Sequence, residues 1–322
     1  MLTRYKIDNG TIVETTEETS PVLVFVAPDD VERRTLREQF ALDDYDMAAL
    51  MDADEIPRLE VVGERTFIIW KIPERAQIGG IIDLGVLTAG LVIYKGRLAI
   101  ILPKGEIATA AREFRGVTTN AAFLLAFIQH TIRHYVGHLR AIKMMSGDIE
   151  KQITVSMENR YLLQMFSLSE CLVYYIDSLE GNSVVLTKLR SLPQTAGIDP
   201  ALLPTLDDII LENNQASRQA NIYSSVLSGL MDARGTIINN NMNVLLTNLT
   251  LINIIFLPLN LIASIGGMSE WSMMTQGIDW RISYGVFMIA MVLLGWGTWL
   301  LVRRIIERRG GNQRFSRKKK RR

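Results

Sequence analysis

The longest apolar pattern in the chain lies between Arg234 and Glu270, where 35 consecutive residues carry no formal charge. An α-helix needs only ~20 apolar residues to cross a bilayer. Isoleucine, leucine, valine and phenylalanine are common in this segment, but asparagine, serine and threonine recur among them. The pattern predicts a membrane-spanning helix that carries an unusual number of polar side chains.

These polar residues are regularly spaced. Eight positions follow one another at intervals of 4, 3, 4, 3, 4, 3 and 4 residues, and six of the eight are polar: Asn239, Asn243, Leu246, Thr250, Asn253, Leu257, Asn260 and Ser264. A repeat of 3.5 residues places all of them on one stripe of a helix. A polar stripe in hydrocarbon is unfavourable unless it faces protein or water.

Two interpretations of this stripe remain open. Asparagine and serine side chains can join membrane helices by hydrogen bonds. Alternatively, several copies of the helix can surround a symmetry axis with the stripe inward, and so enclose a water-filled ion pathway. Six polar residues on a single stripe favour the ion pathway of a homo-oligomer.

A second uncharged segment, residues 282–302, predicts a second membrane helix. Aromatic residues typical of membrane interfaces stand near its two ends: Trp280, Tyr284, Trp296 and Trp299. Residues 303–322 then hold eleven Lys and Arg against one Glu. By the positive-inside rule this tail is cytoplasmic. We therefore expect a multi-pass protein of the inner or plasma membrane with two spans and both termini in the cytoplasm. Topology and contact with anionic membrane lipid explain the tail better than nucleic-acid binding does.

The first 234 residues differ in composition from the rest. The net charge is +1 overall, +10 for residues 303–322 and −1 for residues 235–302, which leaves −8 for residues 1–234. The single cysteine, Cys171, excludes a disulfide framework and a cysteine-based zinc site. No apolar signal sequence opens the chain, so we expect this acidic part to stay in the cytoplasm.

Within this acidic part, β-type and helical patterns follow one another. Residues 1–20 are polar and predict little order, whereas short β-type runs lie between residues 21 and 102. Lys95-Gly96 predicts the turn between the last two runs. Asp29 follows a proline and predicts the cap of a helix.

Farther along, the period becomes helical. We expect one helix over residues 120–146, a break at Gly147 and a second helix over residues 148–192. The period then resumes from residue 206 to 265 without a clear breaker before Pro258. This predicts a single helix that leaves the cytoplasm as a stalk and enters the bilayer, where a proline kink is tolerated.

Together these patterns predict an α+β chain: an N-terminal cytoplasmic α/β domain with long helices, a continuous stalk and pore helix, and two C-terminal transmembrane helices. The expected divisions are a cytoplasmic α/β domain at 1–117, long cytoplasmic helices at 118–204, a stalk helix at 205–240, a first transmembrane pore helix at 241–266, an outer loop at 267–279, a second transmembrane helix at 280–302 and a basic cytoplasmic tail at 303–322.

No motif supports an enzyme. The sequence contains no Gly-rich phosphate loop, no HExxH and no GxSxG. The acidic pairs Asp29-Asp30 and Asp43-Asp44 are better explained as helix caps than as catalytic carboxylates.

The stretch FLPLNLIASIGGMSEW, residues 256–271, resembles the end of the pore helix and the signature loop of the CorA family of divalent-cation channels. The family signature is Gly-Met-Asn after the first of two C-terminal membrane helices. Gly267 and Met268 match it, and Ser269 replaces the asparagine. VLSGLMD at residues 226–232 resembles the family's stalk helix, and the order of the parts resembles the family along nearly the whole chain.

The resemblance implies a homopentameric funnel of stalk helices around a central pore. The pore-facing residues that it implies are Asn243, Leu246, Leu249, Asn253, Leu257, Asn260 and Ser264. They nearly coincide with the stripe found by spacing, except that Leu249 takes the place of Thr250, and we expect both to line the pore. The leucine rings would be apolar constrictions that close by dewetting.

This pore has no charged ring, which suits Mg²⁺ because Mg²⁺ releases its water reluctantly. Amides and hydroxyls can hydrogen-bond the water shell without removing it. The selectivity loop would comprise Gly267, Met268, Ser269 and Glu270, with Glu270 either in a carboxylate ring that concentrates cations or a solvated loop acid. The family includes zinc-transporting members that also vary this triplet, so the resemblance leaves the ion open.

Four residues that precede the first membrane helix are candidates for regulatory metal binding. Asp232 matches a stalk acid that binds regulatory Mg²⁺ between subunits in magnesium channels of the family; otherwise it is a solvated helix acid beside Arg234. His130, His134 and His138 are four residues apart and share one helix face. Adjacent pairs could chelate Zn²⁺, Co²⁺ or Ni²⁺, although packing or surface histidines are the commoner outcome.

We therefore predict transport of divalent metal cations by a CorA-like magnesium channel, with cobalt, nickel or zinc as other cargo and no cofactor required. Its expected partners are copies of itself, membrane lipid and divalent cations, not nucleic acid. Two alternatives remain: a zinc transporter, with or without proton coupling, and a membrane-anchored ion sensor or scaffold with a non-conducting pore. A decayed pore would be expected to lose its polar stripe, and this one keeps it.

Overall fold

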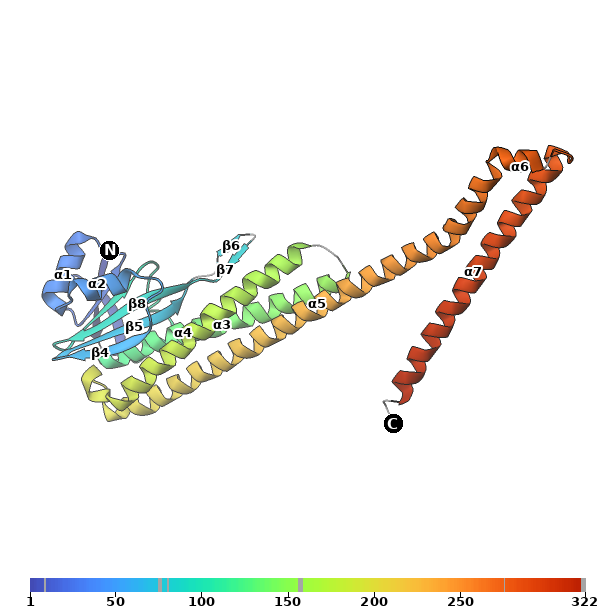
Figure 1. Cartoon of the computed structure of the whole chain (residues 1–322). Helices are drawn as coiled ribbons and strands as arrows, with labels where there is room; N and C mark the ends of the chain where they lie inside the picture. The colour runs from blue at the N-terminus through green and yellow to red at the C-terminus, as the bar shows by residue number, and fades with distance from the viewer. Residues whose placement is uncertain (9, 75–76, 80, 156–158, 275, 320–322) are drawn as a thin grey trace. The chain divides into compact units, whose positions relative to one another are not determined.

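The computed structural model describes Met1 to Lys319 apart from residues 9, 75, 76, 80, 156–158 and 275 (Figure 1). Its contacts divide the chain into two compact units, Met1–Asp232 and Ala233–Arg322. The first unit contains the sheet and the helices that pack on it. The second contains the candidate membrane helices.

A seven-stranded sheet forms the centre of the first unit, in the order β2-β1-β3-β9-β8-β5-β4. Its strands are β1 Leu2–Asp8, β2 Thr11–Thr15, β3 Val22–Val26, β4 Arg58–Val62, β5 Arg65–Pro73, β8 Val86–Tyr94 and β9 Arg97–Leu102, and a separate ribbon is formed by β6 Gln77–Gly79 and β7 Ile81–Asp83. The pairs are antiparallel except β3 and β9, which run parallel. The predicted turn is confirmed, since Lys95 and Gly96 both have positive φ between β8 and β9.

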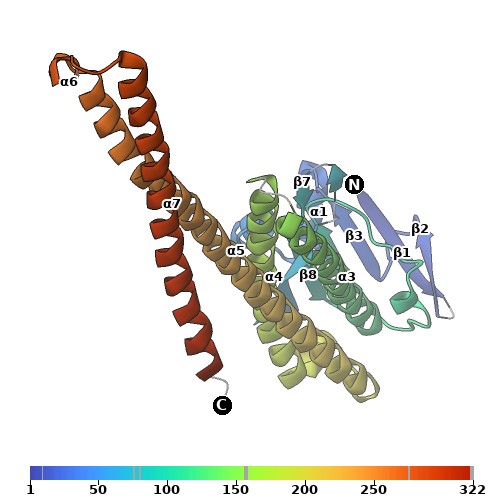
Figure 2. The same cartoon turned by 90° about the vertical axis from the view of Figure 1, so that its right-hand side faces the viewer.

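Helices cover both faces of this sheet: α1 Asp30–Phe40 and α2 Asp44–Met51 lie on one face (Figure 1), and α3 Asn120–Val155 and α4 Asn159–Ser191 lie on the other (Figure 2). Alternate strand residues point to opposite faces. In β3, Leu23 and Phe25 belong to the core under α1 and α2, whereas Val22 and Val24 belong to the core under α3 and α4. Because both faces are covered, the central strands are continuous apolar runs in the sequence.

The helices α3 and α4 also form an antiparallel pair that packs on the first part of α5 (Figure 1). Their shared core includes Tyr135, Leu139, Leu172, Tyr175, Leu179, Ala216, Ala220 and Leu227. Asn182 fastens α4 to β5, because its amide accepts from the Lys71 backbone nitrogen at 3.0 Å and donates to the Lys71 carbonyl at 2.9 Å. Asn213 of α5 donates to the Leu179 carbonyl at 2.9 Å.

The short helices begin at the caps that the sequence predicts. The Asp29 carboxylate accepts from the backbone nitrogens of Val31 at 3.0 Å and Glu32 at 2.8 Å, and the Glu32 carboxylate accepts from the Asp29 nitrogen at 3.2 Å. Asp43 forms the same capping box with Asp46 at the start of α2. These acids are therefore occupied in satisfying helix N-termini.

Two expectations about the first unit are wrong. Residues 1–20 contain the β1–β2 hairpin, which extends the sheet from β3 through long-range pairing that the local pattern does not show. Gly147 does not break a helix, because α3 continues to Val155. A glycine inside a helix costs about 1 kcal/mol, and burial of Ile142 and Ile149 on either side offsets that cost.

The second unit consists of the end of α5 (Leu203–Gly266), the short α6 (Ser269–Met274) and α7 (Trp280–Lys319). The prediction that one helix continues without interruption from the stalk segment into the first candidate span is confirmed, since α5 is a single helix of 64 residues with Pro258 inside it. The segment expected to be a plain outer loop contains α6. Two described helices, Pro200–Gly266 and Trp280–Leu301, are long and apolar enough to cross a membrane.

Candidate ion pathway

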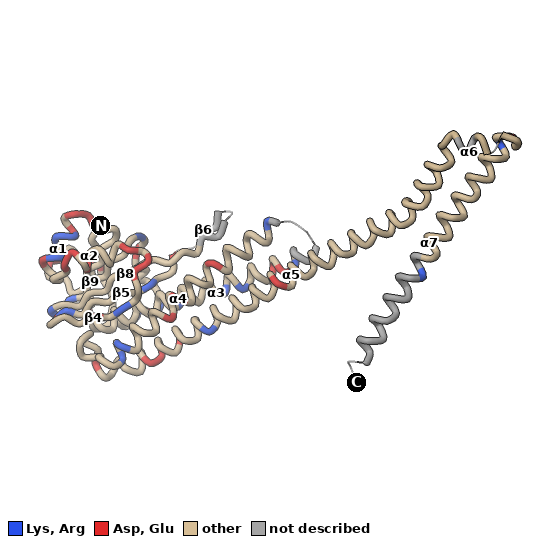
Figure 3. Tube along the Cα trace, viewed as in Figure 1, with Lys and Arg blue, Asp and Glu red and all other residues tan. Residues whose placement is uncertain are grey.

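The end of α5 presents large apolar side chains outward. Leu245, Phe256 and Leu261 are 64%, 57% and 61% exposed, and no charged residue lies between Gly235 and Gly266 (Figure 3). Exposed apolar area costs roughly 25 cal/mol per Å² in water, and monomeric soluble proteins rarely expose such continuous surfaces. This apolar surface is therefore suited to contact with lipid, with further copies of the chain, or with both.

One face of this part of α5 packs on α7. A Cβ placed on Gly295 would lie 3.5 Å from Leu259 Cδ1, and Gly266 is buried against Phe287. The less exposed positions of α5 all fall on this face: Leu251, Ile255, Pro258, Leu259, Ile262 and Gly266. At roughly 100° per residue these positions occupy an arc about 100° wide.

The predicted pore-lining residues lie on the other side of α5. On the same scale, their stripe is centred about 180° from the arc that faces α7. All eight are exposed within the described residues: Asn243, Leu246, Leu249, Thr250, Asn253, Leu257, Asn260 and Ser264. We call these eight residues the polar seam. The second membrane helix of the same chain does not cover it.

The asparagine side chains of the polar seam are polar groups in an apolar part of α5. Among the described residues, neither the Asn253 nor the Asn260 side-chain amide has a hydrogen-bond partner, whereas the Thr250 hydroxyl donates to the Leu246 carbonyl at 2.8 Å. An unsatisfied amide costs several kcal/mol in hydrocarbon, roughly 4–8 by transfer to cyclohexane. Water or another copy must therefore meet these amides if this part of α5 lies in a membrane.

The predicted selectivity loop leaves α5 through a tight turn. The Gly267 nitrogen donates to the carbonyls of Ala263 and Ser264 at 3.1 and 3.2 Å, and the Met268 nitrogen donates to the Ile265 carbonyl at 3.1 Å. Met268 is 52% exposed, Ser269 is exposed and begins α6, and the Glu270 side chain lies outside the described part.

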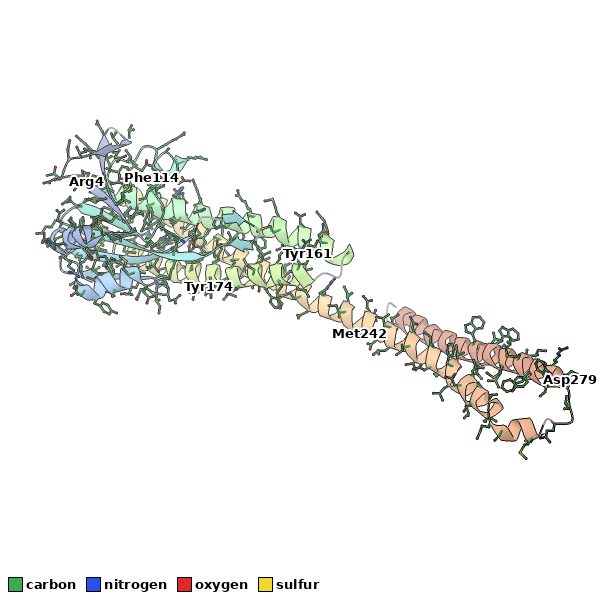
Figure 4. The ribbon with its side chains drawn as sticks, turned by 90° about the horizontal axis from the view of Figure 1, so that it is seen from above. Arg4, Phe114, Tyr161, Tyr174, Met242 and Asp279 are labelled. Atoms are coloured by element: carbon green, nitrogen blue, oxygen red, sulfur yellow. The ribbon has the colours of Figure 1, made fainter. Side chains whose placement is uncertain are left out.

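Asp279 caps the start of α7 at the far end of this connection (Figure 4). Its carboxylate accepts from the Arg281 nitrogen at 3.0 Å, and its carbonyl accepts from the Ile282 nitrogen at 2.9 Å. The Arg281 guanidinium lies 5.5 Å above the Trp280 ring. Asp279 therefore has a structural role at a helix N-terminus.

The predicted metal-binding residues lie in the first unit. Asp232 is exposed on α5. His138 is buried, with its Nδ1 2.6 Å from the Tyr175 hydroxyl, and its ring lies 4.5 Å from that of His134. His130 Nδ1 lies 3.4 Å from a Glu113 carboxylate oxygen. The described residues contain no group of three or more His, Cys, Asp or Glu that could hold a metal ion.

His138 makes the stability of the chain sensitive to acid. Burial and then the neighbouring His134 lower the pKa of His138 to about 4, whereas an unfolded histidine titrates near 6.5. The unfolded chain therefore takes up a proton first, so this stabilisation is complete above about pH 6.5 and is lost as the pH falls toward 4.

From pH 7 to pH 5 this linkage amounts to about 2 kcal/mol. We expect the apparent melting midpoint of the wild-type protein in detergent to fall more over this interval than that of His138→Gln. At pH 8, where histidine is neutral in both states, the two midpoints report only the packing change. Parallel pH profiles for the two proteins would show that His138 titrates normally.

Known proteins resemble this chain along most of its length. The family model described as "CorA-like Mg2+ transporter protein" matches residues 23–304. The cobalt/magnesium transport protein CorA of Methanocaldococcus jannaschii is 26% identical over 255 residues, which cover 75% of this chain and 77% of that relative.

Solved structures share the fold. The complete structure of the CorA magnesium transporter from Methanocaldococcus jannaschii has a TM-score of 0.77 at 20% identity, and the match covers 94% of this chain and 98% of that one. The full-length CmaX protein gives 0.70 at 12% identity, with 93% and 96% covered. The cytoplasmic domain of ZntB from Vibrio parahaemolyticus gives 0.60 at 10% identity, with 74% and 98% covered.

Proposed function

The chain belongs to the family of CorA-like Mg²⁺ transporter proteins, and on this premise we propose that it conducts divalent metal cations through a pore lined by the polar seam of α5. The observation that carries the proposal is the position of the seam. It lies opposite the face that packs on α7, and its Asn253 and Asn260 amides have no partner within the described residues. Copies of α5 around an axis would turn these amides toward enclosed water.

Five copies are proposed, as the resemblance to the family implies. In this assembly the lipid meets the lateral apolar faces of α5 and α7, and the seams meet at the axis. The strongly basic residues 303–322 support a cytoplasmic C-terminus by the positive-inside rule. Because there are two spans, the first unit lies on the same side.

The chemistry of the seam suits a hydrated ion. Amide and hydroxyl groups can hydrogen-bond the water shell of Mg²⁺, which the ion gives up reluctantly. Leu246, Leu249 and Leu257 would narrow the pore between these polar rings and close it by dewetting. We propose Mg²⁺ as the main cargo, with Co²⁺, Ni²⁺ or Zn²⁺ as further cargo; zinc-directed transport is the second candidate because Ser269 replaces the signature asparagine.

Two acids outside the polar seam are proposed to bind divalent ions, one at the pore entrance and one as a regulatory site. A ring of Glu270 carboxylates at the pore entrance would concentrate cations. Asp232 side chains, crowded together in a funnel of α5 helices, would repel one another unless a divalent ion held them together. Loss of that ion would then loosen the closed state.

Ion flux into proteoliposomes tests the proposal. With the inside negative, we expect saturable uptake of Mg²⁺, and competition by Co²⁺, Ni²⁺ or Zn²⁺ ranks the cargo. Saturable uptake of Zn²⁺ without Mg²⁺ would move the assignment to the zinc-directed candidate. Absence of flux for all four ions in a protein that melts cooperatively would contradict conduction and favour the sensor or scaffold.

A further inference from the structure

Phe287 of α7 packs directly against the backbone at the end of α5. A Cβ built on Gly266 would lie 2.6 Å from Phe287 Cζ, 2.9 Å from Cε2 and 3.3 Å from Cε1. Real Cβ atoms essentially never come within 3.0 Å of a heavy atom outside their own residue and its chain neighbours. The ring therefore occupies the space that any side chain at position 266 would need, and Gly266 is accordingly buried.

The other glycine between the two helices makes an ordinary contact. A Cβ on Gly295, which also lies between the two helices, would be at an ordinary 3.5 Å from Leu259 Cδ1. Gly285 and Gly297 are exposed and take no part in this packing. Of the two glycines that lie between the helices, Gly266 therefore makes the closer contact.

Gly266 immediately precedes the predicted selectivity loop. Gly267 and Met268 are tied back to the last turn of α5 by three backbone hydrogen bonds of 3.1–3.2 Å. A shift of that turn relative to α7 therefore carries Met268 and Ser269 with it. Atoms that bind an ion or its water shell must be held to within a fraction of an ångström to act.

We propose that Phe287 is a positioning residue for the pore entrance: its ring, seated on Gly266, fixes the loop 267–269 of each copy and thereby sets the affinity of the entrance for cations. This inference rests on the proposed conduction pathway. It assigns to α7, which does not line the seam, a specific part in transport.

Paired substitutions test the proposal. Gly266→Ala inserts a methyl group against the ring, and Phe287→Leu removes the ring that supports the loop. We expect Gly266→Ala to raise the half-saturating Mg²⁺ concentration in proteoliposomes about tenfold, since small misplacements of binding groups have large effects, while the maximal rate changes less. In the double variant the added methyl group fills the space left by the ring, so the half-saturating concentration should return toward the wild-type value.

Gly295→Ala is the matched control, because it adds the same methyl group between the same two helices where there is room. It should leave the half-saturating concentration unchanged. The proposal is overturned if Gly266→Ala behaves like Gly295→Ala, or if the double variant is no better than the worse single variant.

A second readout does not depend on conduction. Met268→Cys, in a Cys171→Ser background, can be labelled by a membrane-impermeant maleimide. We expect its labelling rate to change when Gly266→Ala is added, to return in the double variant, and to stay constant with Gly295→Ala. If the wild-type protein passes no divalent ion but this labelling pattern is found, the proposed function fails and the positioning role stands. A constant labelling rate in all variants overturns the positioning role.

Discussion

Replacing Asn253 with leucine is expected to lower divalent-cation flux at least tenfold. In the proposed pore, the Asn253 amides lie between the apolar rings of Leu249 and Leu257. Leucine at position 253 would join these rings into one stretch of ~12 Å, at 1.5 Å per residue, in which the only polar side chain is Thr250, whose hydroxyl is bonded to the Leu246 carbonyl. A constriction of that length excludes water, and a hydrated ion cannot enter it. Asn260→Leu should act in the same direction.

Asn248→Leu is the control for this prediction. The same substitution is then made on the same helix, but five residues from Asn253 and so about 140° around the helix from it. Each variant is reconstituted at equal protein content, and initial Mg²⁺ uptake is measured under an inside-negative potential. Equal losses at Asn248 and Asn253 would mean that asparagines matter for helix packing and not for the pathway.

Ser269→Asn is expected to change the ion preference by about tenfold, equivalent to ~1.4 kcal/mol. Asparagine reaches farther than serine and presents an amide oxygen to the water shell of an entering ion. We therefore expect a lower half-saturating concentration for Mg²⁺ and a lower preference for Zn²⁺ over Mg²⁺.

Ser283→Asn provides the comparison for Ser269→Asn, because it makes the same change in the first turn of α7, outside the loop. Uptake of both ions is titrated in wild-type protein and in the two variants. Identical Mg²⁺ and Zn²⁺ uptake in wild type and Ser269→Asn would remove the selectivity role of this position.

The long helices could be predicted because a helical period and its breakers lie within the segment itself. The helical period from residue 206 to 265 has no breaker other than Pro258, and α5 runs from Leu203 to Gly266. Carboxylates that precede a helix predict caps for the same reason, and Asp29 and Asp43 fulfil that role. The β1–β2 hairpin could not be predicted, since its order depends on pairing with β3.

In the candidate site, too, the features that depend on one helix could be predicted, and those that depend on contacts between helices could not. The spacing of Asn253, Leu257 and Asn260 predicts a shared stripe, because a single helix determines which of its residues lie on one face. Which face α7 covers depends on contacts between helices, and the contact of Gly266 with Phe287 has no local signal in the sequence. In the sequence, Gly266 and Gly267 stand only as part of the loop signature, and the burial of Gly266 is known only from the structure.

Water access along α5 tests the central claim most directly. Single cysteines are placed at each position from 246 to 264 in a Cys171→Ser background, and each is exposed to a small water-soluble thiol reagent in the reconstituted protein. The account predicts that reaction rates peak about every 3.5 residues, at 246, 249 and 250, 253, 257, 260 and 264, and are lowest at 255, 259 and 262, which face α7. Unreactive cysteines at 253 and 260, or peaks on the α7 side, would contradict a water-filled pathway along the polar seam.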